Sequence, residues 1–175
     1  TDSMVNRLFR VRISDLEAGV FIDSDNADYR GPNGIVFDKE TNQIRVLCEQ
    51  SRNAPIVAID VVDTSLTVLV RTRITMGGLD GLTSDNNGNT YFSCWNTDII
   101  YSYGPDFQNP PNEFAAGFNN PADIQFNEYG NNLAIPCFGG NTLLLMPLSP
   151  TSVDRSPGDV VPSSSSLHNI YPNPF

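Results

Sequence analysis

The feature of this sequence that most constrains its fold is a phrase that occurs three times. Each copy has a turn of small or polar residues, a short apolar strand, a second polar turn and another strand that ends in cysteine. When the copies are aligned on Ile35, Leu82 and Ile124, they are separated by 47 and 42 residues. A repeat of this length built from short strands is typical of the blades of a β-propeller.

Each copy predicts a four-stranded antiparallel meander, because short alternating runs recur and no apolar stripe keeps helical spacing for three turns. We expect strands at 34–38, 44–49, 55–61 and 66–71, then at 81–85, 90–95, 98–103 and 113–116, and finally at 123–127, 133–137, 142–147 and 151–154. Two earlier strands, at 7–13 and 18–22, read as the outer half of another blade. The prediction is an all-β fold: a β-propeller fragment of about three and a half four-stranded antiparallel blades within residues 1–150.

An arc of this size is short of a ring, since closed propellers have at least four blades. Either further blades precede this segment, or chains associate through the open blade edges that an arc exposes. We favour the first explanation, because Thr1, Asp2 and Ser3 carry no start signal.

The charge of the chain restricts its partners. The formal net charge is −10 and the pI is about 4.3, so binding to nucleic acid or to an anionic membrane surface is disfavoured. No apolar run is long enough to span a bilayer. Cations and a small neutral sugar, lactone or ester are compatible partners, although acidity also serves solubility alone.

The histidine and cysteine content excludes several kinds of catalytic site. His168 is the single histidine, so this segment holds no Ser-His-Asp triad, Cys-His pair or multi-histidine zinc site. Cys48, Cys94 and Cys137 occupy equivalent positions of the three copies, too far apart for disulfides. We expect free thiols that fill the core; a three-thiolate metal site is the alternative.

Asn33 and Asp80 are the candidate functional residues. Each stands directly before a glycine at the start of an innermost strand, where side chains of a propeller converge on the central channel. An amide oxygen and a carboxylate aimed at one point suit Ca²⁺ or Mg²⁺. The alternative is that both residues only form the turn before the strand. Asp123 lies one position later in its copy, so strand alternation would turn it from the axis; it is a further candidate for lining the channel.

These residues also carry a resemblance to a known family. Pro32-Asn33-Gly34-Ile35 and Asp80-Gly81-Leu82, followed by Asp85-Asn86-Asn87-Gly88-Asn89, resemble the senescence-marker-protein/gluconolactonase/regucalcin-like six-bladed propellers, which are related to NHL-repeat propellers. The resemblance covers about residues 6 to 148. It implies that Asn33 and Asp80 bind one divalent cation, Ca²⁺ or Mg²⁺, and that Asp80 is also the catalytic proton-transfer base of lactone hydrolysis.

The chain departs from that family in two respects. The family's glutamate ligand and its substrate-positioning residues come from early blades that this segment does not contain. The resemblance therefore supplies at most two of three protein ligands, and we expect this segment to be inactive alone. The alternative function is a non-enzymatic propeller that serves as a binding or interaction module.

The C-terminal residues have a different character. Residues 151–166 are rich in Ser and Pro and read as a linker. Residues 167–175 end in Tyr171-Pro172-Asn173-Pro174-Phe175 and resemble the start of the C-terminal sorting domain of type IX secretion cargo. That resemblance implies a secreted protein or one on the bacterial cell surface; the alternative is a Pro-rich tail without such a role.

Overall fold

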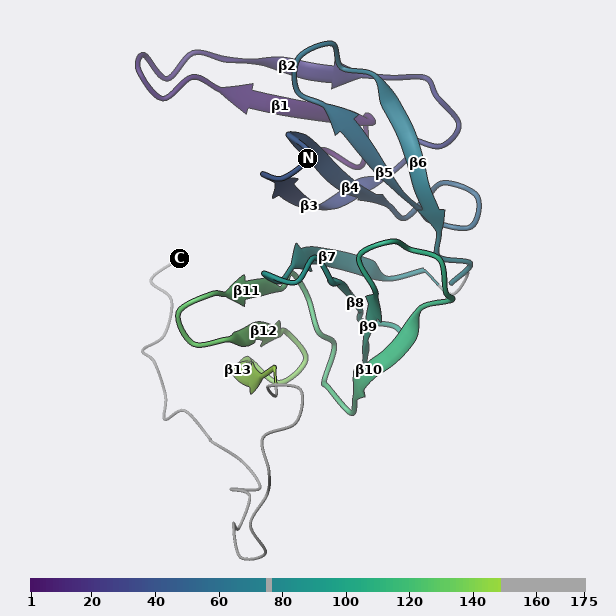
Figure 1. Ribbon diagram of the computed structural model, residues 1–175, viewed down its shortest axis with the longest axis vertical. Coiled ribbons are helices and arrows are strands. Elements are labelled where there is room, and N and C mark those ends of the chain that lie inside the picture. The colour runs from purple at the N-terminus through teal and green to yellow at the C-terminus, as the bar shows by residue number, and fades with distance from the viewer. Residues whose placement is uncertain (75–76, 149–175) are drawn as a thin grey trace, which may run out of the picture.

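The computed structural model describes residues 1–74 and 77–148, and these residues form four antiparallel sheets (Figure 1). The first sheet is a hairpin of two strands, and the next two sheets have four strands each. The last sheet has three strands. In chain order the strands are β1 (Arg7–Val11) and β2 (Ala18–Asp23); β3 (Pro32–Asp38), β4 (Gln43–Cys48), β5 (Pro55–Asp60) and β6 (Leu66–Arg71); β7 (Leu79–Ser84), β8 (Thr90–Cys94), β9 (Ile99–Tyr103) and β10 (Asn112–Ala116); and β11 (Gln125–Asn127), β12 (Asn132–Cys137) and β13 (Thr142–Pro147).

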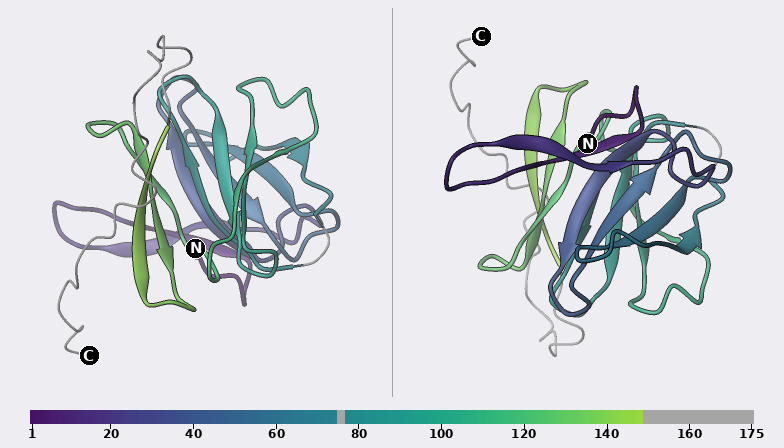
Figure 2. Two further views of the ribbon diagram at one scale, coloured as in Figure 1. Left: turned by 90° about the horizontal axis from the view of Figure 1, so that it is seen from below. Right: turned by 90° about the horizontal axis from the view of Figure 1, so that it is seen from above.

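The sheets follow one another as the blades of a propeller arc (Figures 1 and 2). Within each full blade the strands lie in chain order, from β3 to β6 and from β7 to β10. The innermost strands are neighbours: β3 contacts β7, and β7 contacts β11. The all-β propeller prediction is confirmed. The strand expected at 151–154 lies outside the described residues, as do the linker 151–166 and the segment 167–175.

The third repeat begins later than the sequence predicts. We expected a strand from residue 123, but β11 starts at Gln125. The amide of Ile124 donates to the Asp123 side chain at 3.0 Å, and Pro121 has no amide to donate. The Ile124 amide is thereby taken from the strand ladder, although the Ala122 amide still donates to the Pro136 carbonyl at 2.9 Å. Asp123 therefore precedes β11, and strand alternation does not decide its orientation.

Three apolar clusters hold the blades together, each mainly between two neighbouring sheets. One joins the β1–β2 hairpin to the first full blade, one joins the two full blades, and one joins the second full blade to the three-stranded sheet. Cys48, Cys94 and Cys137 each belong to a different cluster and are buried free thiols. Burial raises the pKa of Cys48 to about 12, which fits the predicted role as core filler and not as metal ligand.

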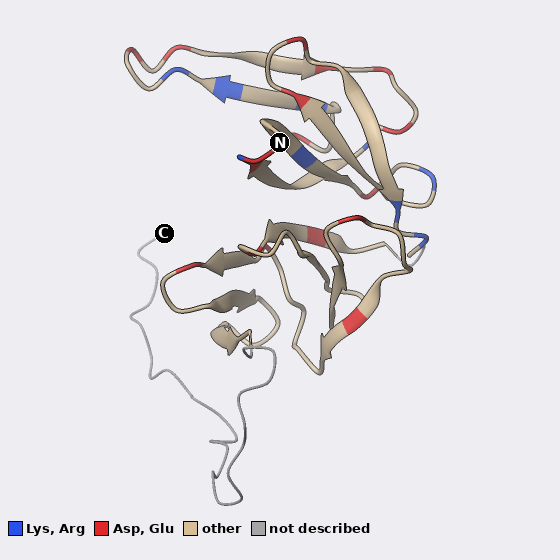
Figure 3. Cartoon of the chain, viewed as in Figure 1, with Lys and Arg blue, Asp and Glu red and all other residues tan. Residues whose placement is uncertain are grey.

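Charge is distributed unevenly along the arc (Figure 3). Lys and Arg occur in the N-terminal half, whereas residues 77–148 contain neither. The acidic residues of that C-terminal stretch are Asp80, Asp85, Asp98, Asp106, Glu113, Asp123 and Glu128. Among the described residues there is no helix with the length and apolar character needed to cross a membrane.

Candidate functional site

Two glycines bring the innermost strands into close contact at one end of the central channel. A methyl group at Gly34 would lie 2.6 Å from the backbone nitrogen of Leu82, and one at Gly81 would lie 2.7 Å from the Cα of Asp123. Neither distance leaves room for a side chain, so glycine lets β3, β7 and the start of the third repeat approach through their backbones. The residue before each glycine is thereby carried to the same end of the channel.

Asn33 and Asp80 lie next to each other there. The Asn33 amide nitrogen donates to the Leu79 carbonyl at 3.3 Å, and the Asn33 side chain also hydrogen-bonds to the Asp80 carboxylate. Both residues are partly buried. The structure thus brings together the two residues that the sequence predicted, across the junction of two blades.

The Asp80 carboxylate is in an unfavourable environment for its charge. Burial raises its pKa, the nearby Asp123 carboxylate raises it further, and the hydrogen bond from Asn33 only partly opposes these effects. Asp123 is itself exposed, but it stands close enough to act on Asp80. A bound cation would relieve this repulsion, since carboxylate and amide oxygens are the ligands of hard divalent ions.

Glu49 is a fourth polar residue at this end of the channel, and our sequence reasoning missed it. It follows Cys48 at the end of β4, where the backbone amide of Gly78 donates to its carboxylate. Burial and the charge of Asp80 raise its pKa. The repeat contains the signal that could have identified Glu49. Each residue after a repeat cysteine occupies the same position, and that residue is Glu49 in one copy but Trp95 and Phe138 in the others.

A buried serine fixes the backbone beneath these side chains. The Ser93 hydroxyl accepts a hydrogen bond from the Gly81 amide at 2.8 Å and donates to the Ala122 carbonyl. Ser93 is fully buried, so this bridge is protected from water. It ties the second full blade to the third repeat directly below Asp80 and Asp123.

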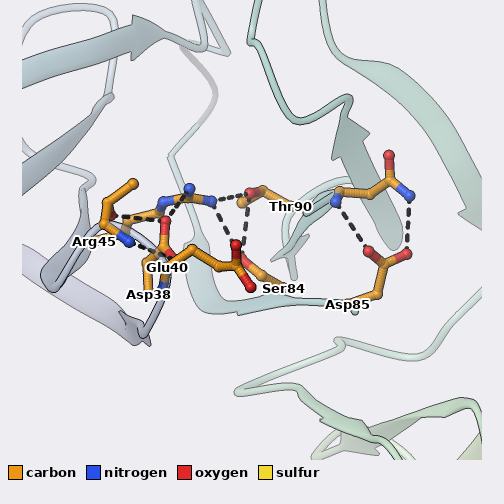
Figure 4. Close-up of polar contacts among 8 residues, drawn as sticks. Asp38, Glu40, Arg45, Ser84, Asp85 and Thr90 are labelled. Atoms are coloured by element: carbon orange, nitrogen blue, oxygen red, sulfur yellow. Dashed lines mark hydrogen bonds and ion pairs between the residues drawn. The ribbon is translucent and has the colours of Figure 1, made fainter. Parts of the chain in front are cut away.

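The opposite end of the innermost strands forms a groove of about 950 Å³. Arg45 crosses from β4 toward the next blade there, bonding to Thr90 at 3.0 Å and pairing with Asp38 (Figure 4). The Asp85 carboxylate accepts hydrogen bonds from Asn89 and from the Tyr91 hydroxyl. Because these charged groups satisfy one another, we assign them to holding the blades together and not to ligand binding.

The described residues limit what the Asn33–Asp80 site can bind. Among them, no group of three or more His, Cys, Asp or Glu side chains is arranged to hold a metal ion. A cation at Asn33 and Asp80 would therefore complete its coordination with water, substrate or ligands outside this arc.

Comparison with known proteins places the fold among propellers. No protein-family model matches the chain, and no curated protein shows significant sequence similarity to it. Solved structures do match: a nidogen/laminin complex (TM-score 0.66, 15% identity over 81% of this chain and 53% of that one) and a gluconolactonase from Xanthomonas campestris (TM-score 0.60, 16% identity, 83% and 51%). A catalytically inactive virginiamycin B lyase from Staphylococcus aureus with quinupristin also matches (TM-score 0.55, 11% identity, 86% and 52%). The chain spans about half the length of each, and at these identities the likeness concerns the fold.

Proposed function

We propose that this arc contributes a divalent-cation site, for Ca²⁺ or Mg²⁺, to the hydrolysis of a lactone or ester. The observation that carries the proposal is the convergence of Asn33, Asp80 and Asp123 at one end of the channel, with the Asp80 carboxylate half-buried beside another acid. Similarity of fold to a gluconolactonase supports the same reaction class.

The donor set fits a hard divalent cation. Asn33 offers an amide oxygen and Asp80 a carboxylate, and these are oxygen ligands of the type that Ca²⁺ and Mg²⁺ prefer. The described residues include no histidine, and the cysteines are buried in the core. The acidic surroundings favour the entry of a cation and disfavour an anionic substrate.

In this proposal the residues have separate roles. When bound, the cation would polarise the substrate carbonyl and acidify a water molecule. Asp80 holds and transfers a proton at its carboxylate, and its raised pKa brings it closer to the operating range of a general base. Asn33 orients that carboxylate through its amide nitrogen. The substrate would be a small neutral sugar, lactone or ester, which the acidic residues at this end of the channel would not repel.

Calorimetric titration with CaCl₂ and MgCl₂ tests the cation site. We expect saturable binding that Asp80→Asn weakens by at least about tenfold, because it removes a charged ligand. Asp25→Asn is the matched control, since Asp25 is an exposed loop residue and should leave binding unchanged. Absence of binding, or equal binding in both variants, would refute the site.

Because we expect the segment to be inactive alone, the reaction is tested by a cation-dependent rate on lactones or aryl esters in a protein that carries this arc within a complete ring. Loss of that rate in Asp80→Asn supports the hydrolase. Cation binding without hydrolysis favours the second function, a non-enzymatic binding module, and that alternative has its own support in the likeness to the propeller of a nidogen/laminin complex. For either function we propose a secreted or cell-surface location, which the acidic charge and the sequence of residues 171–175 support.

A further inference from the structure

The groove of about 950 Å³ lies at the end of the innermost strands opposite to Asn33 and Asp80. Those two residues stand at the starts of β3 and β7, whereas the groove is lined by the ends of β3 and β7, by β11 and by the turns that follow them. Its volume is near the upper end of the range of about 300–1,000 Å³ that small-ligand sites occupy. The groove therefore has room for a ligand of several linked rings.

The buried charges in the groove are already neutralised within the protein. Arg45 pairs with Asp38 (Figure 4). The Asp85 carboxylate accepts hydrogen bonds from its own turn and from the Tyr91 hydroxyl. The remaining charged side chains that line the groove are exposed and of both signs: Lys39, Glu40 and Glu128. A strongly charged ligand would find no unpaired buried partner of opposite charge here, so the groove favours a neutral ligand.

Two aromatic side chains line the groove and are open to solvent. Phe37, on β3, is 55% exposed, and Tyr129, in the turn between β11 and β12, is 95% exposed. Val36 packs against the apolar cluster between the two full blades, so strand alternation turns its neighbour Phe37 toward the channel. A sugar ring has C–H bonds on its face and hydroxyl groups on its edge. Exposed aromatic rings offer the flat apolar surface that such a face can cover.

Uncharged polar groups in the groove match the hydroxyl groups of a sugar. The exposed amide side chains are Asn86, Asn87 and Gln125. The side chains of Asn86 and Asn87 make no hydrogen bond to another described residue. The Gln125 amide nitrogen donates to the Phe126 carbonyl at 3.0 Å, which leaves the amide oxygen as an acceptor. Because an amide can both donate and accept, as a hydroxyl group does, these side chains suit a polyhydroxylated neutral ligand.

The turns that carry these groups are held in place by the protein itself. The Asp85 carboxylate accepts hydrogen bonds from the backbone amides of Asn87 and Asn89, each at 2.9 Å. In the third repeat, the Asn127 side chain accepts a hydrogen bond from the Tyr129 amide at 3.2 Å. Turns ordered in this way lose less entropy when a ligand binds.

We propose that this groove binds a neutral oligosaccharide. Phe37 and Tyr129 contact the faces of its sugar rings, and the amide side chains of the groove bind its hydroxyl groups. The site is at the opposite end of the channel from the Asn33–Asp80 pair, and the inference does not depend on the hydrolysis proposed above. Its role is to attach the protein to a glycan and not to carry out a reaction on it.

Saturation-transfer difference NMR on the full chain tests the proposal. The probes are maltohexaose, cellohexaose and N-acetylchitohexaose, which are neutral hexasaccharides. The matched ligand control for each probe that binds is the same sugar oxidised at C6 to carboxylates. We expect saturable transfer to the ring C–H protons of at least one neutral probe. The oxidised form should respond more weakly, because the chain has a net charge of −10.

Four variants locate the site. Tyr129→Ala and Phe37→Leu each remove an aromatic ring at an exposed position, so folding is retained and binding should weaken by about threefold to tenfold. Phe138→Leu is the control for Phe37→Leu, since Phe138 is also 55% exposed but is not part of the groove lining, and it should bind as the unmodified chain does. Asp80→Asn should also keep oligosaccharide binding.

The remaining outcomes overturn the inference. They are no transfer to any of the three neutral probes, an equal response from the oxidised sugar, or equal binding by the groove variants and Phe138→Leu. If Asp80→Asn abolished binding while Tyr129→Ala did not, the sugar would lie at the Asn33–Asp80 end, and the groove would be refuted without loss to the proposed function. If a capped, uncharged hexapeptide of serine and glycine displaced the sugar, the groove would be a peptide site instead.

Discussion

At the scale of single residues, glycine decides where the candidate site can form. Gly34 and Gly81 lack the side chain that would otherwise keep neighbouring innermost strands apart. The same glycines place Asn33, Asp80 and Asp123 at one end of the channel. The pairing of a polar residue with a following glycine is thus a packing requirement first, and it brings the residues of the proposed cation site together as a consequence.

Gly81→Ala should destabilise the chain by about 1–3 kcal/mol, because the added methyl overlaps the backbone of the third repeat. Gly19→Ala is the matched control: nothing lies within 4 Å of a methyl group there, so its effect should be small. Urea denaturation followed by circular dichroism measures both. Equal stability of the two variants would contradict the close-approach explanation.

A second prediction concerns buried hydroxyl groups. The Tyr29 hydroxyl is buried and has no hydrogen-bond partner among the described residues, and burial raises the pKa of Tyr29. Removing an unpaired polar group relieves its desolvation cost, so Tyr29→Phe should leave stability unchanged or raise it by about 1 kcal/mol.

The control for Tyr29→Phe is Tyr91→Phe, which loses a hydrogen bond to Asp85 at 3.0 Å. We expect this variant to be less stable by about 1 kcal/mol. The two substitutions are chemically identical, so opposite signs in thermal or urea denaturation isolate the effect of the partner. Loss of stability in Tyr29→Phe of the same size would show that its hydroxyl is paired.

At the scale of the elements, Arg45 links the two full blades, because it pairs with Asp38 of its own blade and donates to Thr90 of the next blade at 3.0 Å (Figure 4). Both side chains are 11% exposed, and Arg45 also lies over the Phe107 ring at 5.4 Å. Burial alone would raise the pKa of Asp38, but hydrogen bonds from Thr41 and the Arg45 charge outweigh it, so the pKa is below its ordinary value of 3.8. The pair therefore stabilises the fold while Asp38 is ionised.

Asp38→Asn should cost about 3 kcal/mol at neutral pH, because it leaves a buried guanidinium without its counter-ion. The folded-state pKa of Asp38 is depressed, so its stabilising contribution is complete above about pH 4 and is lost as the pH falls through that pKa. The difference between the original chain and the variant should therefore shrink in acid.

Asp28→Asn is the control, since the Asp28–Arg71 pair is more exposed and should contribute less than about 1 kcal/mol. A difference that does not shrink as the pH is lowered would contradict this assignment.

At the scale of the whole molecule, the arc exposes apolar surface at both ends. Phe9, Val11 and Val20 are about half exposed on the β1–β2 hairpin, and Leu143 and Leu145 are exposed on β13. β13 is also an edge strand in the described part of its sheet. Exposed apolar edges of this kind associate with other strands.

We therefore predict that the chain associates with itself as its concentration rises. Light scattering on a sizing column should show a mass that increases with concentration, and Val11→Lys combined with Leu145→Lys should reduce it, since charges on an edge oppose pairing. A single monomeric mass for the original chain across the concentration range would contradict the prediction.

Much of this molecule was predictable from its sequence. The three copies of the repeat determined the all-β fold and the order of strands, because period and turn chemistry are local properties. They also identified Asn33 and Asp80. They did not identify Glu49, since the residues at its repeat position differ in type and only the contact between blades brings its carboxylate to the Gly78 amide.

What the tertiary structure alone decided is which side chains face one another across blade junctions. The sequence places Asp123 one position out of step and predicts that it turns away; the structure starts β11 after it and leaves it acting on Asp80. Likewise, the repeat does not single out Arg45, whereas the fold places it between Asp38 of its own blade and Thr90 of the next. The physical reason is the same in both cases: a propeller blade is specified by local pattern, but these contacts are made by residues of successive blades, some 40 to 50 residues apart, that meet only when the blades stack.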